Sequence, residues 1–198
     1  MAKVEMHLIQ ELRDRTGLGM MDCKKALEET NGNIELAIDV LRKKGALVAA
    51  KRSGRETAEG IVHAYIHPGD RVGVLLEINC ETDFVAHNDN VKQFAKDVSM
   101  HIAALKPLYL APEDVDAAFL EKEKSIFREQ LASSGKPAQV LEKIVEGKVN
   151  KLYSEICLLK QFFVKNDQLT IEQVLQELIA KTGENIKLKR FVRFEIGG

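Results

Sequence analysis

The first 45 residues carry three short patterns of apolar residues at helical spacing. Two of them cover about residues 4–15 and 20–30, and glycines interrupt the chain between them. The third begins after Asn33, a favourable helix cap, and is expected to end at Gly45. Its apolar residues are Ile34, Ala37, Ile38 and Leu41. The pattern therefore predicts a compact three-helix module over residues 1–45.

A basic stretch follows this module. Residues 42–55 contain six basic residues and no acidic residue, together with two glycines and a serine. Clustered Lys and Arg can bind a phosphate backbone, but no aromatic residue is interleaved here to stack on bases. The composition favours a solvated linker, which we place at residues 46–57.

From residue 59 apolar and polar residues alternate, which is the period of a β-strand. Two such runs, EGIVHAYIH and RVGVLLEIN, flank a Pro-Gly turn and predict an antiparallel hairpin. The final KLKRFVRFEIG alternates in the same way and is expected to form a third strand. A small three-stranded antiparallel sheet is therefore predicted within a core at residues 58–198.

Helical patterns occupy the rest of that core. An apolar stripe over residues 91–102 predicts one helix. Two charged helices are expected to form a helical hairpin over about residues 113–158, with its turn at Gly135 and Pro137. A last helix is predicted at about residues 170–181. The fold class is therefore α+β, with a three-helix module in front of a sheet packed with helices.

Composition and charge exclude several classes of protein. The 198 residues are 45% hydrophobic, and 29 basic residues nearly balance 30 acidic ones, which is typical of globular proteins and argues against a protein that blankets phosphates. No apolar run has the length of a membrane span, and the N-terminus lacks a signal-peptide pattern, so we expect a cytoplasmic protein without membrane contact. Three widely spaced cysteines do not form a disulfide framework.

The candidates for catalytic or metal chemistry are few. Cys80 and His87 lie seven residues apart beside two acidic residues, but no orienting group or oxyanion site can be identified for a nucleophile and base pair. His63 and His67 are about 13 Å apart along a strand, which is too far for one zinc ion. The sequence holds no phosphate-binding or zinc-protease motif. We therefore expect no enzyme activity, metal site or cofactor.

Phe84 is the unusual residue of the segment CETDF. On pattern alone a core-facing ring is favoured, because Phe84 precedes the apolar Val85 and Ala86. The alternative is an exposed aromatic at a strand-to-helix junction, where loops often carry function.

Three long segments occur in the order found in one known family. They are LRDRTGLGMMDCKKALEETNGNIELAIDVLRKKG, CETDFVAHN after EGIVHAYIH, and KIVEGKVNKLYSEICLLKQFFVKN. Together they closely resemble the bacterial elongation factor Ts family, nearly from end to end. The resemblance implies a guanine-nucleotide exchange factor that binds elongation factor Tu with GDP and promotes its replacement by GTP.

The resemblance also implies roles for particular residues. In that family the N-terminal module is a ubiquitin-associated-like bundle that docks on the GTPase, and its contacts match Arg13, Met20 and Met21. We expect Met21 to be the more buried of the two methionines. The TDFV tetrapeptide, credited with dislodging magnesium from Tu, matches Thr82, Asp83, Phe84 and Val85.

The chain departs from the family in three places and in length. His87 replaces a basic residue, and Lys160 and Phe162 replace an acid and a proline. A single sheet hairpin resembles the short form, which pairs two chains, so a homodimer is expected. Two rival functions remain, which are a nucleic-acid adaptor using the basic linker and KLKRFVR, and a binding module whose bundle serves an unrelated partner.

Overall fold

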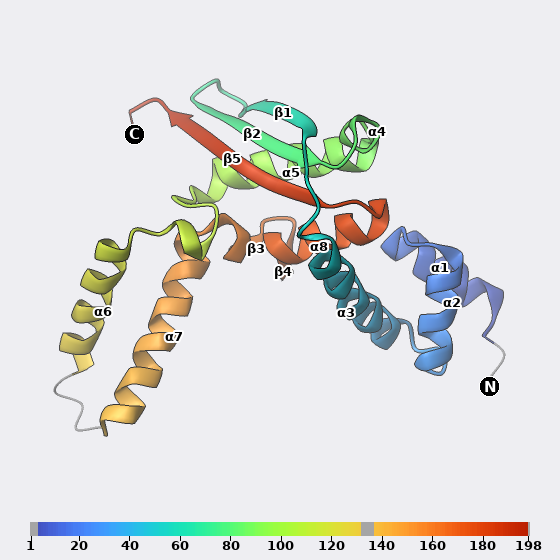
Figure 1. Cartoon of the computed structure of the whole chain (residues 1–198), viewed down its shortest axis with the longest axis horizontal. Helices are drawn as coiled ribbons and strands as arrows, with labels where there is room; N and C mark the ends of the chain where they lie inside the picture. The colour runs from blue at the N-terminus through green and yellow to red at the C-terminus, as the bar shows by residue number, and fades with distance from the viewer. Residues whose placement is uncertain (1–3, 132–136, 198) are drawn as a thin grey trace. The chain divides into compact units, whose positions relative to one another are not determined.

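The computed structural model describes residues 4–131 and 137–197. It opens with three helices, labelled in Figure 1 as α1 (Met6–Thr16), α2 (Met20–Glu29) and α3 (Ile34–Arg52). Gly17 ends α1 in the left-handed conformation at φ 67°, and the Asn33 side chain caps α3 by accepting the Leu36 N–H at 3.0 Å. Their common core consists of Ile9, Leu12, Cys23, Ala26, Leu27, Ala37 and Leu41. The predicted three-helix bundle is confirmed.

The end of the third helix was predicted wrongly. Gly45 lies inside α3, which continues to Arg52, so residues 46–52 of the predicted linker are helical. No strong helix breaker follows Gly45 in this run, and its alanines favour a helix. Gly45 is buried, and a Cβ at this position would lie 3.3 Å from the Cβ of Ala180, so the glycine permits close packing on a later helix.

Three strands form the predicted antiparallel sheet. They are β1 (Glu59–Ile66), β2 (Val72–Cys80) and β5 (Ile186–Glu195), and β2 lies between the other two (Figure 1). The β1–β2 turn contains Gly69 and Asp70, both with positive φ, at 95° and 58°. Alternate residues of β2 are buried, which agrees with the period of two in the sequence.

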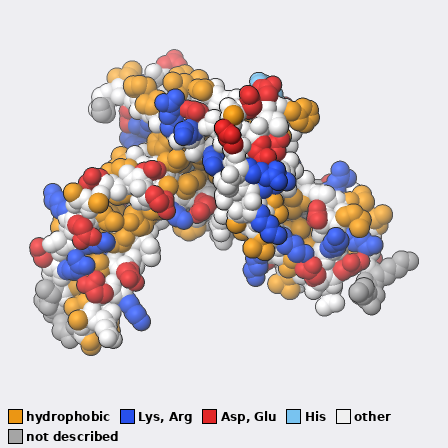
Figure 2. Space-filling model, in the orientation of Figure 1, with side chains coloured by type: hydrophobic (Ala, Val, Ile, Leu, Met, Phe, Trp, Pro, Cys, Tyr) orange, Lys and Arg blue, Asp and Glu red, His pale blue; other side chains and the backbone are white. Residues whose placement is uncertain are grey.

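Two long helices follow the sheet hairpin as a helical pair. After α5 (Asp89–Leu105) and the single turn η1 (Pro112–Asp114), the chain forms α6 (Ala117–Leu131) and α7 (Ala138–Ile156). Figure 2 shows acidic and basic side chains interspersed over α6 and α7, with hydrophobic side chains gathered along the pair. The predicted helical hairpin is confirmed. Of the two residues expected at its turn, Gly135 lies outside the described residues and Pro137 immediately precedes α7.

The segment after α7 differs from the prediction. A short turn, η3 (Leu158–Lys160), leads into two small paired strands, β3 (Phe162–Phe163) and β4 (Asn166–Thr170), that the sequence pattern did not predict. The next helix, α8 (Ile171–Thr182), is the predicted last helix, and Gly183 follows it with φ 75°. Lys160 contacts Glu172 at 2.7 Å, so this departure from the family pattern is accommodated by an ion pair.

A buried histidine joins α5 to this segment. Its Nε2 donates to Gln161 Oε1 at 2.9 Å, and its Nδ1 accepts the Val164 N–H at 3.2 Å. The residue is His101, and its burial lowers the pKa of the imidazole below the ordinary 6.5. The neutral ring is therefore the form that fits this environment.

The described residues group into two compact units. The first comprises residues 4–63, 77–96 and 173–189, and the second comprises residues 64–76, 97–172 and 190–197. The first unit contains the three-helix bundle, the loop after β2 and most of helix α8. Within the described ranges, no helix has both the length and the apolar character needed to cross a bilayer.

Candidate functional site

The TDFV tetrapeptide forms a single helical turn directly after β2. This turn, α4 (Asp83–Ala86), begins at Thr82, whose hydroxyl oxygen accepts the Val85 N–H at 3.4 Å. Val85 and Ala86 are buried and attach the turn to the rest of the unit. The sequence therefore builds a short capped turn with two buried residues at its end.

Phe84 points outward from this turn. Its side chain is 83% exposed, so the core-facing ring favoured by the pattern alone is wrong. The reason is local, because Val85 and Ala86 take the buried positions of α4. Thr82 and Asp83 are exposed beside the ring. The structure therefore presents three polar or aromatic side chains together on one exposed turn.

His87 folds back onto the same turn. Its Nδ1 lies 3.0 Å from the Asp83 carbonyl oxygen and 3.0 Å from Asp83 Oδ1. Both side chains are exposed, so a protonated imidazole would form an ion pair that solvent screens. This departure from the family pattern places an imidazole on the turn that carries Phe84.

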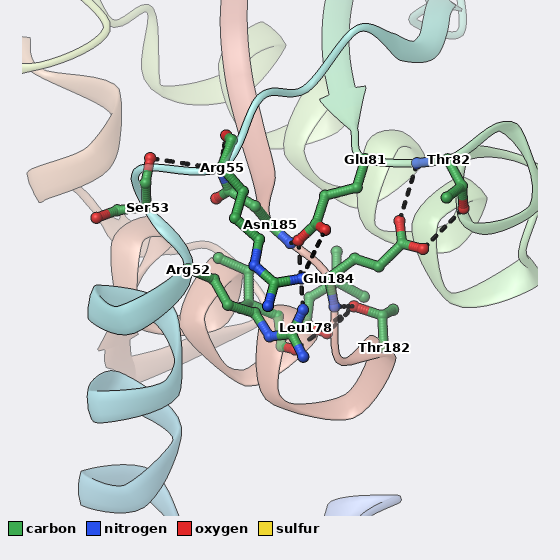
Figure 3. A network of polar contacts seen from close by, with 10 residues as sticks. Arg52, Ser53, Arg55, Glu81, Thr82, Leu178, Thr182, Glu184 and Asn185 are labelled. Carbon is green, nitrogen blue, oxygen red and sulfur yellow. Dashed lines mark hydrogen bonds and ion pairs between the residues drawn. The ribbon is translucent and has the colours of Figure 1, made fainter.

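A carboxylate two residues beyond α8 holds the residue that begins the turn. The Thr82 hydroxyl donates to Glu184 Oε1 at 2.7 Å, and the Thr82 backbone N–H donates to Glu184 Oε2 at 3.1 Å (Figure 3). Thr82 thus donates hydrogen bonds to both carboxylate oxygens of Glu184. Hydrogen bonds to an ionised acceptor are stronger than neutral ones.

The carboxylate of Glu81, the residue before Thr82, binds the segment after α8 in return. Glu81 accepts the Asn185 backbone N–H at 2.6 Å and pairs with Arg55 at 3.1 Å and Arg52 at 3.4 Å (Figure 3). The Asn185 N–H, followed by the Arg55 and Arg52 guanidinium groups, lowers the pKa of Glu81. Glu81 is therefore ionised at neutral pH.

Asn185 ties the same segment to the chain that follows α3. Its side-chain amide donates to the Arg55 carbonyl oxygen at 2.8 Å and to the Ser53 carbonyl oxygen at 3.4 Å. The residue is only 2% exposed. The end of the basic stretch is therefore held by contacts of Arg52, Ser53 and Arg55 with Glu81 and Asn185. No pattern in the sequence predicted these contacts.

The predicted docking residues lie on the three-helix bundle. Arg13 is exposed near the end of α1, and Met20 and Met21 begin α2. Met20 is 43% exposed and Met21 is 61% exposed, so the expectation that Met21 is the more buried is wrong. The predicted site residues therefore form two groups, one at the α1–α2 turn and one on α4.

The chemistry of Cys80 argues against a nucleophile at this position. The thiol is fully buried, and burial followed by the nearby charge of Glu184 raises its pKa to about 11. Such a thiol stays protonated at neutral pH. Within residues 4–131 and 137–197, no three His, Cys, Asp or Glu side chains are placed to hold a metal ion.

Comparison with known proteins decides the family. The family model described as elongation factor TS matches residues 24–198. The chain is 56% identical over 194 residues to elongation factor Ts of Carboxydothermus hydrogenoformans, covering 98% of this chain and 89% of that protein. The chain belongs to the elongation factor Ts family. It is likewise 53% identical over 195 residues to the elongation factor Ts of Fervidobacterium nodosum, covering 98% of this chain and 99% of that protein. Over 197 residues it is 52% identical to that of Desulfosudis oleivorans, covering 100% of both chains.

Membership of this family gives the function. Elongation factor Ts is a translation elongation factor and the nucleotide exchange factor for elongation factor Tu. The resemblance inferred from the sequence is confirmed, and the comparisons do not support the alternative of a nucleic-acid adaptor.

Proposed function

We propose that this chain releases GDP from elongation factor Tu by presenting Phe84 to the site that holds magnesium and phosphate. The observation that carries the proposal is the exposed ring on a turn whose other residues are buried or bonded. A large apolar side chain held in water has favourable free energy to gain when a partner covers it. A mobile loop would lose part of that gain to ordering.

The physical basis of exchange is differential binding. GTPases hold GDP through magnesium and backbone N–H groups around the phosphates. An exchange factor needs only to bind the nucleotide-free state more tightly than the GDP state, and the two ligands then weaken one another equally. A typical coupling of about 1 to 3 kcal/mol changes affinity about 5- to 150-fold. A wedge that rearranges the metal site would give a stronger coupling than this.

Each residue of the turn has a part in this proposal. Phe84 enters the partner, and Asp83 offers a carboxylate that can accept N–H groups of the partner. Thr82 and Val85 hold the turn, Thr82 through its bonds to Glu184 and Val85 through burial. The chain alters no covalent bond and needs no metal or cofactor of its own, so it acts as an exchange factor rather than an enzyme.

Docking is assigned to the bundle at residues 1–45. Arg13, Met20 and Met21 are exposed at one end of it, and exposed methionines suit adaptable apolar contacts with a partner. We expect direct contact with Tu in the cytoplasm, where translation takes place, and no direct contact with nucleic acid or membrane.

We further propose that two copies of the chain form a homodimer. Apolar side chains are exposed on the strands of the sheet and just beyond its last strand, at Ile66, Leu75, Val192, Phe194 and Ile196. An exposed apolar strand surface is a typical site of association, and a second copy offers the same surface. The single core copy also fits the short form of the family, which pairs chains.

The proposed activity is tested with purified Tu loaded with fluorescent GDP. The full chain is added at one part in twenty of the Tu concentration together with excess GTP. The proposal predicts that every Tu molecule loses its label at an accelerated rate, because one exchange factor serves many GTPases. Release of label from only a stoichiometric fraction of Tu, or no acceleration, would contradict it.

A further inference from the structure

We propose that Glu184 is a positioning residue for nucleotide exchange, which holds the turn that presents Phe84 to the partner. The inference rests on the proposed role of Phe84. Glu184 lies 102 residues from Thr82 in the sequence and outside the TDFV tetrapeptide. It contacts the turn at its first residue, two positions before Phe84.

The geometry of the contact fixes the backbone rather than one rotamer. Glu184 accepts the Thr82 N–H at 3.1 Å and the Thr82 hydroxyl at 2.7 Å. Thr82 has the extended conformation of a helix cap, with φ −131° and ψ 151°. Because the backbone N–H and the side chain bind the same carboxylate, both the position and the rotation of Thr82 are set. The direction in which Phe84 leaves the turn follows from them.

A second carboxylate makes the contact reciprocal. Glu81, which precedes Thr82, accepts the backbone N–H of Asn185, which follows Glu184. The pair Glu81–Thr82 and the pair Glu184–Asn185 thus each supply one carboxylate and one backbone N–H to the other pair, as Figure 3 shows. Such an arrangement admits one register between the two segments.

The segment that carries Glu184 is itself fixed. The Thr182 hydroxyl donates to the Leu178 carbonyl oxygen at 2.9 Å, and the Glu184 N–H donates to Thr182 Oγ1 at 3.5 Å. Asn185 is buried and bonded to the segment after α3. The turn that carries Phe84 is therefore attached to a segment that has hydrogen bonds of its own.

These bonds matter more for positioning than for global stability. Thr82 is exposed, and exposed polar contacts contribute little to unfolding free energy. Val85 and Ala86 keep the turn attached to the core without Glu184. Loss of Glu184 should therefore leave the chain folded but let residues before Phe84 sample other conformations. Exchange should then be slower, because the Phe84 ring has to be ordered while the partner binds.

The test measures maximal GDP release and the concentration for half-maximal release, using the full chain. Glu184→Ala should lower the maximal rate about tenfold, the order expected for losing hydrogen bonds to a charged group, and leave half-saturation nearly unchanged. Glu184→Gln should give a maximal rate between those of the parent chain and Glu184→Ala, because the glutamine carbonyl oxygen still accepts one hydrogen bond. The matched control is Glu177→Ala, which removes an ion pair between α8 and Arg42 of α3 and should change neither value.

The decisive comparison uses the same substitution in a chain that lacks the ring. If Glu184 acts through Phe84, Glu184→Ala should slow the parent chain but have no further effect on the Phe84→Ala chain. Equal slowing in both backgrounds would overturn the proposal, because a merely structural role does not depend on the ring. Should Glu184→Ala fail to fold, Glu184→Gln in both backgrounds decides the same question.

Failure of the inference can be told apart from failure of the proposed function. If Phe84→Ala exchanges nucleotide normally, the role of Phe84 is wrong and Glu184 has nothing to position. If Phe84→Ala is slow and neither Glu184 variant is, the inference about Glu184 alone is wrong.

Discussion

Replacing Phe84 by alanine separates a partner-binding ring from a core ring. The side chain is 83% exposed, so its removal leaves no cavity. Substitutions of this kind change the free energy of unfolding by about 0.5 kcal/mol or less. A buried phenylalanine would cost about 3 to 5 kcal/mol instead. Melting temperature should therefore stay within the range of the parent chain.

Exchange activity should respond in the opposite way. An aromatic residue at the centre of an interface contributes about 2 kcal/mol or more when it is truncated to alanine. Each 1.4 kcal/mol corresponds to about a tenfold change in rate, so catalysed GDP release should fall at least about tenfold. The release of labelled GDP and thermal unfolding are measured on the same preparation.

Two phenylalanines of this chain provide the controls. Phe94 is only 6% exposed in α5, so Phe94→Ala should lower stability by about 3 to 5 kcal/mol and keep its activity per folded molecule. Phe162 is 56% exposed in β3, and Phe162→Ala should change neither quantity. A strongly lowered melting point for Phe84→Ala with normal activity per folded molecule would refute the reasoning.

Three further predictions concern docking, assembly and pH. Combined alanine substitution of Arg13, Met20 and Met21 should raise the half-saturating concentration and leave the maximal release rate unchanged; a lower maximal rate with unchanged half-saturation would contradict a docking role. Sedimentation at micromolar concentration should give twice the 22.2 kDa chain mass, and Phe194→Asp should reduce it to one chain; a single-chain mass for the active parent would exclude the dimer. Because burial lowers the pKa of His101, the unfolded chain binds more protons near pH 6 than the folded chain does. The contribution of His101 to the free energy of unfolding should therefore be complete above pH 6.5 and decrease below it. Urea unfolding should show a smaller loss on acidification for His101→Gln, and an equal loss would contradict this assignment.

Helices and strands with long periodic patterns could be predicted from the sequence. The bundle, the sheet hairpin, the helical pair and the last strand all follow from the spacing of apolar residues together with caps and turn residues. The two-stranded β3–β4 unit was missed because β3 has only two residues and β4, with the sequence NDQLT, does not alternate apolar and polar residues. The end of α3 was placed wrongly at Gly45 because the sequence alone does not distinguish a glycine that allows close packing inside a helix from a glycine that ends a helix.

The candidate site could be predicted only in part. The tetrapeptide and the docking residues came from resemblance to a family, whereas the apolar neighbours Val85 and Ala86 favoured a buried Phe84. Exposure of the ring depends on the single turn that places Val85 and Ala86 inward. The bonds from Glu184 to Thr82 join residues 102 positions apart, and no local pattern marks such pairs. Tertiary structure was needed to find them.

The central claim is that Phe84 enters the metal and phosphate site of Tu, and photo-crosslinking tests it most directly. The substitution Phe84→p-benzoylphenylalanine keeps an aromatic ring at this position and adds a reactive ketone. The modified chain is irradiated with nucleotide-free Tu, and the crosslinked peptides are identified by mass spectrometry. We expect a crosslink to a Tu peptide that lines the magnesium and phosphate site, and loss of that crosslink when excess GDP and magnesium are added. A crosslink only to a distant surface of Tu, or only to a second copy of this chain, would contradict the claim.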